Sequence, residues 1–152
     1  MPRIKERIDV SAPPSDVFRF CHDFDRRPEW DERISAIEVL SSGPVRRGTL
    51  MSIDACRGGE YVFSWDAELA DYSFPHSSTL RVVTVARSSP FRDGSEQWTF
   101  DKANGGTRVT VVWAYEARGL LARLAGALWR RAGTRRDIRR TLNNLKQAVE
   151  AG

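Results

Sequence analysis

The sequence predicts an α+β fold in which a curved antiparallel sheet packs against one long C-terminal helix. Apolar residues between positions 120 and 150 recur every three or four residues, which is the spacing of a single helix face. These residues are Leu121, Leu124, Leu128, Ile138, Leu142, Leu145 and Val149. Most of the chain before this segment alternates apolar and polar residues between turns, as β-strands do. A long amphipathic helix needs an apolar surface, and a curved sheet provides one.

Seven strands are predicted, six of them in direct succession. They cover residues 3–10, 34–40, 49–55, 61–69, 79–87, 96–100 and 109–115. The alternation is clearest in 61–69. The pair Asn104-Gly105 favours a tight hairpin turn before the last strand. Both faces of the strand 79–87 carry apolar residues, so the sequence does not show which face points inward.

A short helical stretch is predicted after the first strand. Ser11 and Ser15 are both possible N-caps, and the two prolines between them suit a first helical turn. We expect the helix to end before Pro28, because a proline disfavours helical conformation in the residue before it. Trp30 is then expected in a charged loop, with its indole tucked beneath that loop.

The composition is that of an ordinary globular protein of 152 residues, 41% of them hydrophobic and 29% charged. We expect one domain spanning 1–152. No apolar run approaches the roughly 18 residues that cross a bilayer, and the first residues lack the apolar core of a signal peptide, so a cytoplasmic location is expected. Cys21 and Cys56 show no metal-ligand spacing and are expected to be free thiols.

Positive charge gathers in the C-terminal helix. Residues 120–150 hold eight basic and two acidic side chains, a balance of +6 in a chain of net charge +4, so the remainder carries −2. One interpretation is a solvated outer face. The other is weak contact with an anionic membrane or an acidic partner. That contact would use Arg135, Arg136, Arg139 and Arg140. Nucleic acid is not expected as a partner, because aromatic residues for base stacking are not interleaved with the charges.

Several short sequence motifs of this chain also occur in known proteins. They are APPSDVF (12–18), PEW (28–30), QWTF (97–100), GGTRVT (105–110) and LNNLK (142–146). Together they resemble the polyketide cyclase/dehydrase-like branch of the START-related (SRPBCC) superfamily over essentially the whole chain. The resemblance implies a helix-grip fold. In that fold a strongly bent antiparallel sheet of six to seven strands wraps around the C-terminal helix, with an apolar cavity between them.

The strands that would face this cavity are rich in aromatic residues. Such rings can line a binding space, or they can simply fill the core. The expected ligand-binding residues are Met51, Ile53, Phe63, Trp65, Trp98, Phe100, Val111, Trp113, Tyr115, Leu128 and Ala132. The leading hypothesis is therefore the binding of a small hydrophobic molecule, such as a lipid, a polyketide-like aromatic or an isoprenoid.

Catalysis is the alternative, and the sequence leaves it undecided. It contains no known nucleophile, metal or phosphate-binding motif, and we expect neither a cofactor nor a metal. A polyketide cyclase or dehydratase could instead act through cavity shape and one or two polar groups. The candidates are Tyr115, Glu116, His76, Asp66 and Arg81, with Tyr115 preferred because it shares a face with Trp113. Both histidines, His22 and His76, are expected at surface or loop positions.

The middle of the predicted helix is irregular. Arg131 and Arg135 interrupt its apolar stripe beside Gly133, and glycine inside a helix costs about 1 kcal/mol relative to alanine. Either this part borders the cavity, with an arginine facing a ligand or rotated toward solvent, or the helix bends or breaks near Gly133. The stripe is continuous toward both ends, where we expect the helix to seal against the sheet.

Overall fold

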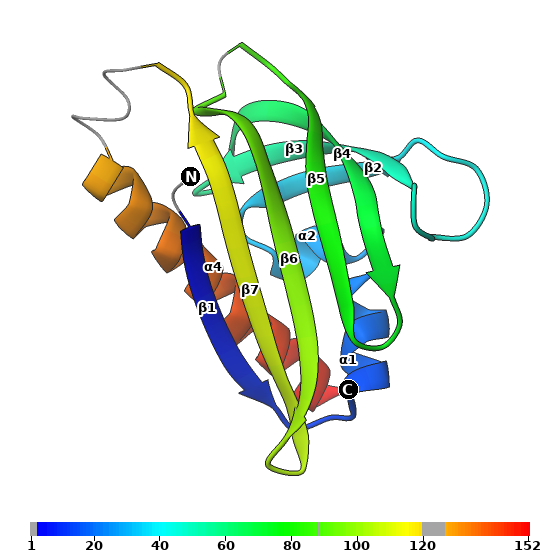
Figure 1. The fold of residues 1–152 in the computed structure, drawn as a ribbon. Helices are drawn as coiled ribbons and strands as arrows, with labels where there is room; N and C mark the ends of the chain where they lie inside the picture. The colour runs from blue at the N-terminus through cyan, green and yellow to red at the C-terminus, as the bar shows by residue number, and fades with distance from the viewer. Residues whose placement is uncertain (1–2, 88, 120–126) are drawn as a thin grey trace.

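Seven strands form one antiparallel sheet in the computed structural model, which describes residues 3–87, 89–119 and 127–152, and the side chains of the last segment from residue 132 onward. The strands are β1 (Arg3–Val10), β2 (Ile34–Val39), β3 (Leu50–Arg57), β4 (Glu60–Ser73), β5 (Ser77–Val85), β6 (Phe91–Ala103) and β7 (Gly106–Ala117). Their order across the sheet is β1-β7-β6-β5-β4-β3-β2 (Figure 1). The predicted sheet of six to seven strands is confirmed.

Irregular pairing lets this sheet curve. The register shifts between β2 and β3, between β3 and β4, twice between β4 and β5, and once between β6 and β7. Each bulge adds twist and bends its strand. The predicted hairpin between β6 and β7 is also confirmed, because Asn104 and Gly105 take positive φ values of 50° and 78°.

The first helix, α1 (Pro14–Cys21), begins differently from the prediction. Its N-cap is Pro13, and no side chain caps it, so Ser11 and Ser15 were the wrong candidates. Pro13 already has the extended conformation of a cap residue. A proline is well tolerated in the first turn, because the backbone N–H that it lacks would have no acceptor within the helix. The apolar face of α1 is confirmed, with Val17, Phe18 and Cys21 buried.

A second short helix, α2 (Arg27–Trp30), replaces the predicted loop. The expectation that Pro28 would keep Arg27 out of a helix is wrong. Pro28 lies in the first turn of α2, where a proline is well tolerated. The helix ends at Trp30, whose side chain is only 4% exposed. The indole is therefore part of the core rather than of a surface loop.

The long C-terminal helix, α4 (Ala127–Ala151), is continuous through Gly133, so the alternative of a break there is wrong. Ile138, Leu142 and Leu145 of the predicted stripe are buried. Leu121 and Leu124 lie outside the described residues, as does the side chain of Leu128. The helix runs beside β1 (Figure 1). Within the described residues, no helix is long and apolar enough to cross a membrane.

Two groups of buried apolar residues lie between the sheet and the helices. The larger group joins α1, α2 and α4 to β1, β6 and β7. The smaller one lies on β3, β4 and β5 and is centred on Met51, Ile53, Leu69 and Leu80, with Phe24 against it. The open question about β5 is answered here, because Ser78, Leu80 and Val82 are its buried side chains.

Candidate functional site

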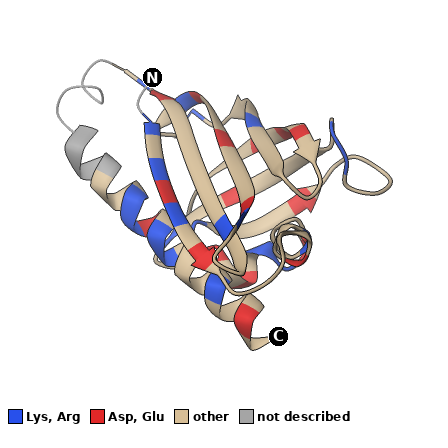
Figure 2. Ribbon diagram, turned by 60° about the horizontal axis from the view of Figure 1, so that its bottom comes forward, with Lys and Arg blue, Asp and Glu red and all other residues tan. Residues whose placement is uncertain are grey.

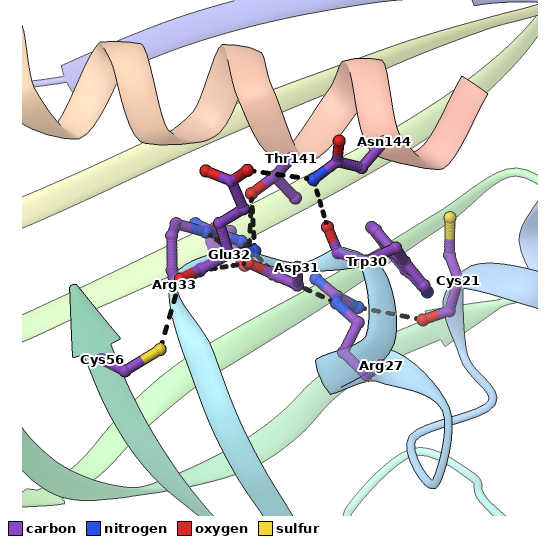
Figure 3. A network of polar contacts seen from close by, with 10 residues as sticks. Cys21, Arg27, Trp30, Asp31, Glu32, Arg33, Cys56, Thr141 and Asn144 are labelled. Atoms are coloured by element: carbon purple, nitrogen blue, oxygen red, sulfur yellow. Dashed lines mark hydrogen bonds and ion pairs between the residues drawn. The ribbon is translucent and has the colours of Figure 1, made fainter. Parts of the chain in front are cut away.

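Four charged residues form a buried ion-pair cluster beneath α4 (Figure 3). They are Arg27, Asp31, Arg33 and Glu96. The carboxylate of Asp31 accepts hydrogen bonds from Arg27 Nε at 3.0 Å and from Arg33 Nη2 at 2.9 Å, both on Oδ2. Arg33 Nε donates to Oδ1 of Asp31 at 3.0 Å, and Arg33 Nη1 donates to Glu96 of β6. The cluster therefore connects α2 to the inner face of the sheet.

The C-terminal helix completes this cluster. Thr141 Oγ1 lies 3.3 Å from Asp31 Oδ1 and accepts from the Glu32 backbone N–H at 3.3 Å. Asn144 Nδ2 donates to the Trp30 carbonyl at 3.1 Å and to Glu32 Oε1 at 3.3 Å. Figure 3 shows both α4 side chains above this segment. Thr141 and Asn144 thus tie α4 to the residues that carry the charges.

Charge pairing keeps the cluster ionised. Burial alone would raise the pKa of Asp31, but Arg33 and Arg27 together hold that pKa well below its usual range. Burial alone would lower the pKa of Arg33, yet Asp31 and Glu96 raise it above its ordinary value. Two cations face two anions, so the cluster carries no net charge.

The guanidinium of Arg27 lies between two indole rings. Its central carbon is 4.6 Å from the ring centroid of Trp30 and 4.7 Å from that of Trp98. The two rings are 6.1 Å apart and nearly perpendicular. Within the described part of the chain, Arg27 Nη2 and the Nε1 of both indoles have no hydrogen-bond acceptor. A buried donor without a partner costs about 1–3 kcal/mol, so three of them in contact are an unusual feature.

His22 is buried, which corrects the expectation that it lies at the surface. Its ring stacks on Phe18 at 4.1 Å, and its Nδ1 lies 2.6 Å from the Phe18 carbonyl. A carbonyl only accepts, so Nδ1 carries the proton and Nε2 accepts from the Ser78 hydroxyl at 2.7 Å. Burial lowers the pKa of His22 to about 4. His76 lies in the turn between β4 and β5, as expected.

An aromatic cluster occupies the inner face of the sheet at the end where β6 begins and β7 finishes. It comprises Phe63, Trp65, Phe91, Trp113 and Tyr115. The centroid of Phe91 is 5.2 Å from that of Trp113 and 6.0 Å from that of Trp65. Phe91 is 8% exposed and Trp113 9%, whereas Phe100, further along the same face, is 1% exposed. Phe91 and Trp113 are therefore slightly more exposed than Phe100 on the same face.

Gly94 makes room for the indole ring of Trp113. A Cβ at Gly94 would come within 2.8 Å of the Ala114 carbonyl oxygen and 3.0 Å of the Trp113 ring. The indole of Trp113 therefore lies directly over β6. Glu96, two residues along the same face, pairs in register with Trp113. The aromatic cluster and the buried ion-pair cluster are thus neighbours on β6 and β7.

The expected ligand-binding residues separate into groups. Seven of them belong to the larger core group or pack against it: Phe63, Trp65, Trp98, Phe100, Val111, Trp113 and Tyr115. Met51 and Ile53 are fully buried in the smaller group instead. Ala132 is exposed, which corrects its expected inward position; among the described side chains of α4 the buried stripe begins at Ile138. The side chain of Leu128 lies outside the described residues.

Of the candidate catalytic residues, only Tyr115 joins the aromatic cluster, where it stacks on Trp113 at 6.0 Å. The structure does not bring the other four candidates to it. They are Glu116, His76, Asp66 and Arg81. Glu116 pairs with Arg92, and Arg81 is exposed and pairs with Glu68 at 3.2 Å. Asp66 alternates with inward residues of β4 and so points away from the helices.

Comparison with known proteins supports the expected family. A sequence profile of the family described as polyketide cyclase/dehydrase and lipid transport matches residues 1–150. The chain belongs to this family. A comparison with curated protein sequences gives no match.

Solved structures of the same fold agree with this assignment. An aromatase/cyclase from Streptomyces sp. R1128 superposes with a TM-score of 0.80 at 16% identity, covering 98% of this chain and 93% of its own. A START superfamily protein from Mycobacterium smegmatis gives 0.78 at 13% identity, covering 98% and 97%. A Thermus thermophilus protein gives 0.79 at 19% identity, covering 99% and 98%. The helix-grip fold is therefore confirmed.

In this member of the polyketide cyclase/dehydrase and lipid transport family, basic residues recur along α4 (Figure 2), and several of them form ion pairs within the chain. Arg135 Nη1 lies 2.6 Å and Arg139 Nε 3.1 Å from Glu6 Oε1 on β1. Arg136 lies 3.8 Å from Asp137. Arg135 therefore faces the edge strand rather than a ligand. Contact of α4 with an anionic membrane or an acidic partner stays a prediction.

The buried ion-pair cluster of this family member is a feature that we did not predict. The segment 29–33 has the composition of a surface loop, which hides the burial of Asp31. One signal was present, since Glu96 shares the inward face of β6 with Trp98. Within the described residues, no three His, Cys, Asp or Glu side chains gather as metal ligands would.

Proposed function

We propose that this protein binds a small hydrophobic molecule between the inner face of its sheet and α4. The observation that carries the proposal is the aromatic cluster, whose rings gather at one end of that face and of which Trp65 and Tyr115 are only half-buried. Trp113 is 9% exposed and Trp65 is half-buried, whereas Phe18 and Ile4 of the same core group are fully buried.

The family and the related structures support the same class of function. The family description includes lipid transport as well as cyclisation. Trp and Tyr side chains are well suited to line a site for an apolar ligand, because each combines a large apolar ring with one hydrogen-bond donor. Lipids, polyketide-like aromatics and isoprenoids all present the apolar surface that such rings accept.

Quenching of tryptophan emission tests the proposal. We expect fluorene, palmitate or farnesol to give saturable one-to-one quenching and to raise the melting temperature, because a ligand at 100 times its Kd adds about 2.7 kcal/mol of stability. Trp113→Leu should weaken the binding at least ten-fold. Val83→Ala is the matched control, because Val83 is 49% exposed on the other face of the sheet. A panel that changes neither emission nor melting temperature would overturn the proposal.

A cyclase or dehydratase activity on a polyketide is the second candidate, and Tyr115 favours it. This phenol is the one candidate polar group that joins the aromatic cluster, where it could donate to a carbonyl oxygen of a bound poly-β-ketone. Tyr115→Phe keeps the ring and removes the hydroxyl. An unchanged product distribution with this variant, or no turnover by the wild type, would count against catalysis without affecting ligand binding.

A further inference from the structure

We propose that Arg27, Trp30 and Trp98 form a donor site for a neutral carbonyl oxygen of an aromatic ligand. This inference rests on the proposed function and adds a chemical class to it. The donor site consists of Arg27 Nη2 and the Nε1 atoms of Trp30 and Trp98. All three groups are buried, and within the described residues none of them meets an acceptor.

The three residues are in mutual contact and fixed in place. The guanidinium carbon of Arg27 is within 4.7 Å of both indole centroids. Its Nε is held by Asp31 at 3.0 Å and its Nη1 by the Cys21 carbonyl at 2.9 Å. Nη2 is the nitrogen of this side chain that has no acceptor within the described residues. The side chains are 3–4% exposed, so the donors are held in position before any ligand arrives.

The chemistry of the donor site specifies an acceptor. A guanidinium and two indoles offer N–H groups and no lone pairs. A ligand oxygen placed beside them would accept hydrogen bonds from these groups. A purely apolar ligand would leave all three donors without a partner, so the site distinguishes ligands by an oxygen atom.

The charge balance favours a neutral oxygen over an anion. Arg27 and Arg33 are already matched by Asp31 and Glu96. Burial lowers the pKa of His22 to about 4, so this nearby histidine is neutral at pH 7. A carboxylate would therefore add an unpaired buried charge, which is strongly unfavourable. A ketone or quinone oxygen accepts the same hydrogen bonds without that penalty.

The donor site is also within reach of the aromatic cluster. Trp98 and Glu96 are successive inward side chains of β6, and Glu96 pairs in register with Trp113. A polycyclic ligand lying along β6 would contact Trp113 with part of its ring system and present its carbonyl oxygen to Trp98.

A matched pair of probes tests the inference. Fluorene and 9-fluorenone have the same three-ring outline and differ in one carbonyl group. Wild-type protein should bind fluorenone about five-fold more tightly than fluorene, as hydrogen bonds to a neutral oxygen allow. Trp98→Phe and Trp30→Phe keep a ring and remove one N–H. Each should weaken fluorenone binding roughly two- to five-fold while leaving fluorene nearly unchanged.

Trp65→Phe is the control, because it makes the same chemical change outside the donor site and should affect both probes equally. The infrared carbonyl band of bound fluorenone gives a second readout. It should move to lower wavenumber on binding to wild type and move part of the way back in Trp98→Phe, which a merely structural role of Trp98 would not produce.

The outcomes separate the two proposals. Selective loss of fluorenone affinity together with the band shift supports the donor site. Equal binding of both probes, unaffected by Trp98→Phe and Trp30→Phe, overturns the donor site and leaves hydrophobic binding intact. Binding of neither these probes nor the lipid and isoprenoid panel overturns the proposed function itself.

Discussion

Thr141 donates a hydrogen bond of 3.3 Å to Asp31, a residue 110 positions earlier in the chain. Thr141 is 1% exposed and Asp31 is fully buried. The contact joins the long C-terminal helix to the one carboxylate that holds both Arg27 and Arg33. The attachment of α4 near its middle is therefore polar as well as apolar, and it should be sensitive to the charge on Asp31.

Replacement of Asp31 by Asn should destabilise the protein by about 3–5 kcal/mol, because it leaves the buried Arg27 and the half-buried Arg33 with the carboxylate of Glu96 alone. Urea unfolding at pH 7 measures the change. Asp16→Asn is the control. Asp16 is exposed and 3.9 Å from Arg19, so its loss should change stability by less than about 0.5 kcal/mol. Similar effects of the two substitutions would show that the cluster contributes little.

The buried neutral state of His22 predicts a pH dependence of stability. The folded pKa is about 4, against an ordinary value of 6.5. Between these values the unfolded chain binds a proton that the folded chain does not, so stability is complete above pH 6.5 and falls as the pH drops toward 4. The full loss is about 3 kcal/mol. Urea unfolding across this range should show the slope in wild type and in the turn variant His76→Gln, and a much flatter curve in His22→Gln.

Two glycine substitutions should have opposite signs. Gly94→Ala should destabilise the protein by about 1–3 kcal/mol and perturb Trp113, because the added Cβ meets the Ala114 carbonyl at 2.8 Å. Gly133→Ala should instead stabilise it by up to about 1 kcal/mol, since alanine favours a helix and the nearest atom outside α4 is 3.5 Å away, at the flexible end of Arg57. Thermal unfolding and near-ultraviolet circular dichroism measure both. A silent Gly94→Ala would remove the argument for close packing of Trp113 on β6.

The two free thiols should differ in reactivity. Burial raises the pKa of Cys21 to about 12, so its thiolate is scarce at about pH 8 and its sulfur is enclosed. Cys56 is half-buried and donates to the Glu32 carbonyl at 3.3 Å. Iodoacetamide should therefore modify only Cys56 in the folded protein and both cysteines in urea, as mass spectrometry would show. Modification of folded Cys56→Ser would contradict the burial of Cys21.

The fold was predictable because its signals are local. Alternation in β4, the Asn104-Gly105 turn and the stripe ending at Leu145 each depend on neighbours within a few residues. The buried ion-pair cluster depends on contacts that sequence spacing does not encode. Arg33 and Glu96 are 63 positions apart and meet only because the sheet curves beneath α4.

The candidate site was predictable only in part, for the same reason. The alternation of β4 and β7 correctly placed Trp65 and Trp113 on the inner face. It could not show that Met51 packs into a separate core group. Local rules also failed at α2, where Pro28 lies in the first turn of a helix instead of preventing one. Burial of His22 could not be predicted because its partner Ser78 lies 56 positions away.

Nuclear magnetic resonance of the indole N–H groups tests the central claim most directly. Titration of labelled protein with fluorene should produce saturable shifts of the Trp65 and Trp113 signals, with the exposed amides of the outer face, such as that of Val83, unmoved. Saturating ligand that shifts neither indole, or shifts only outer-face amides, would contradict binding between the sheet and α4.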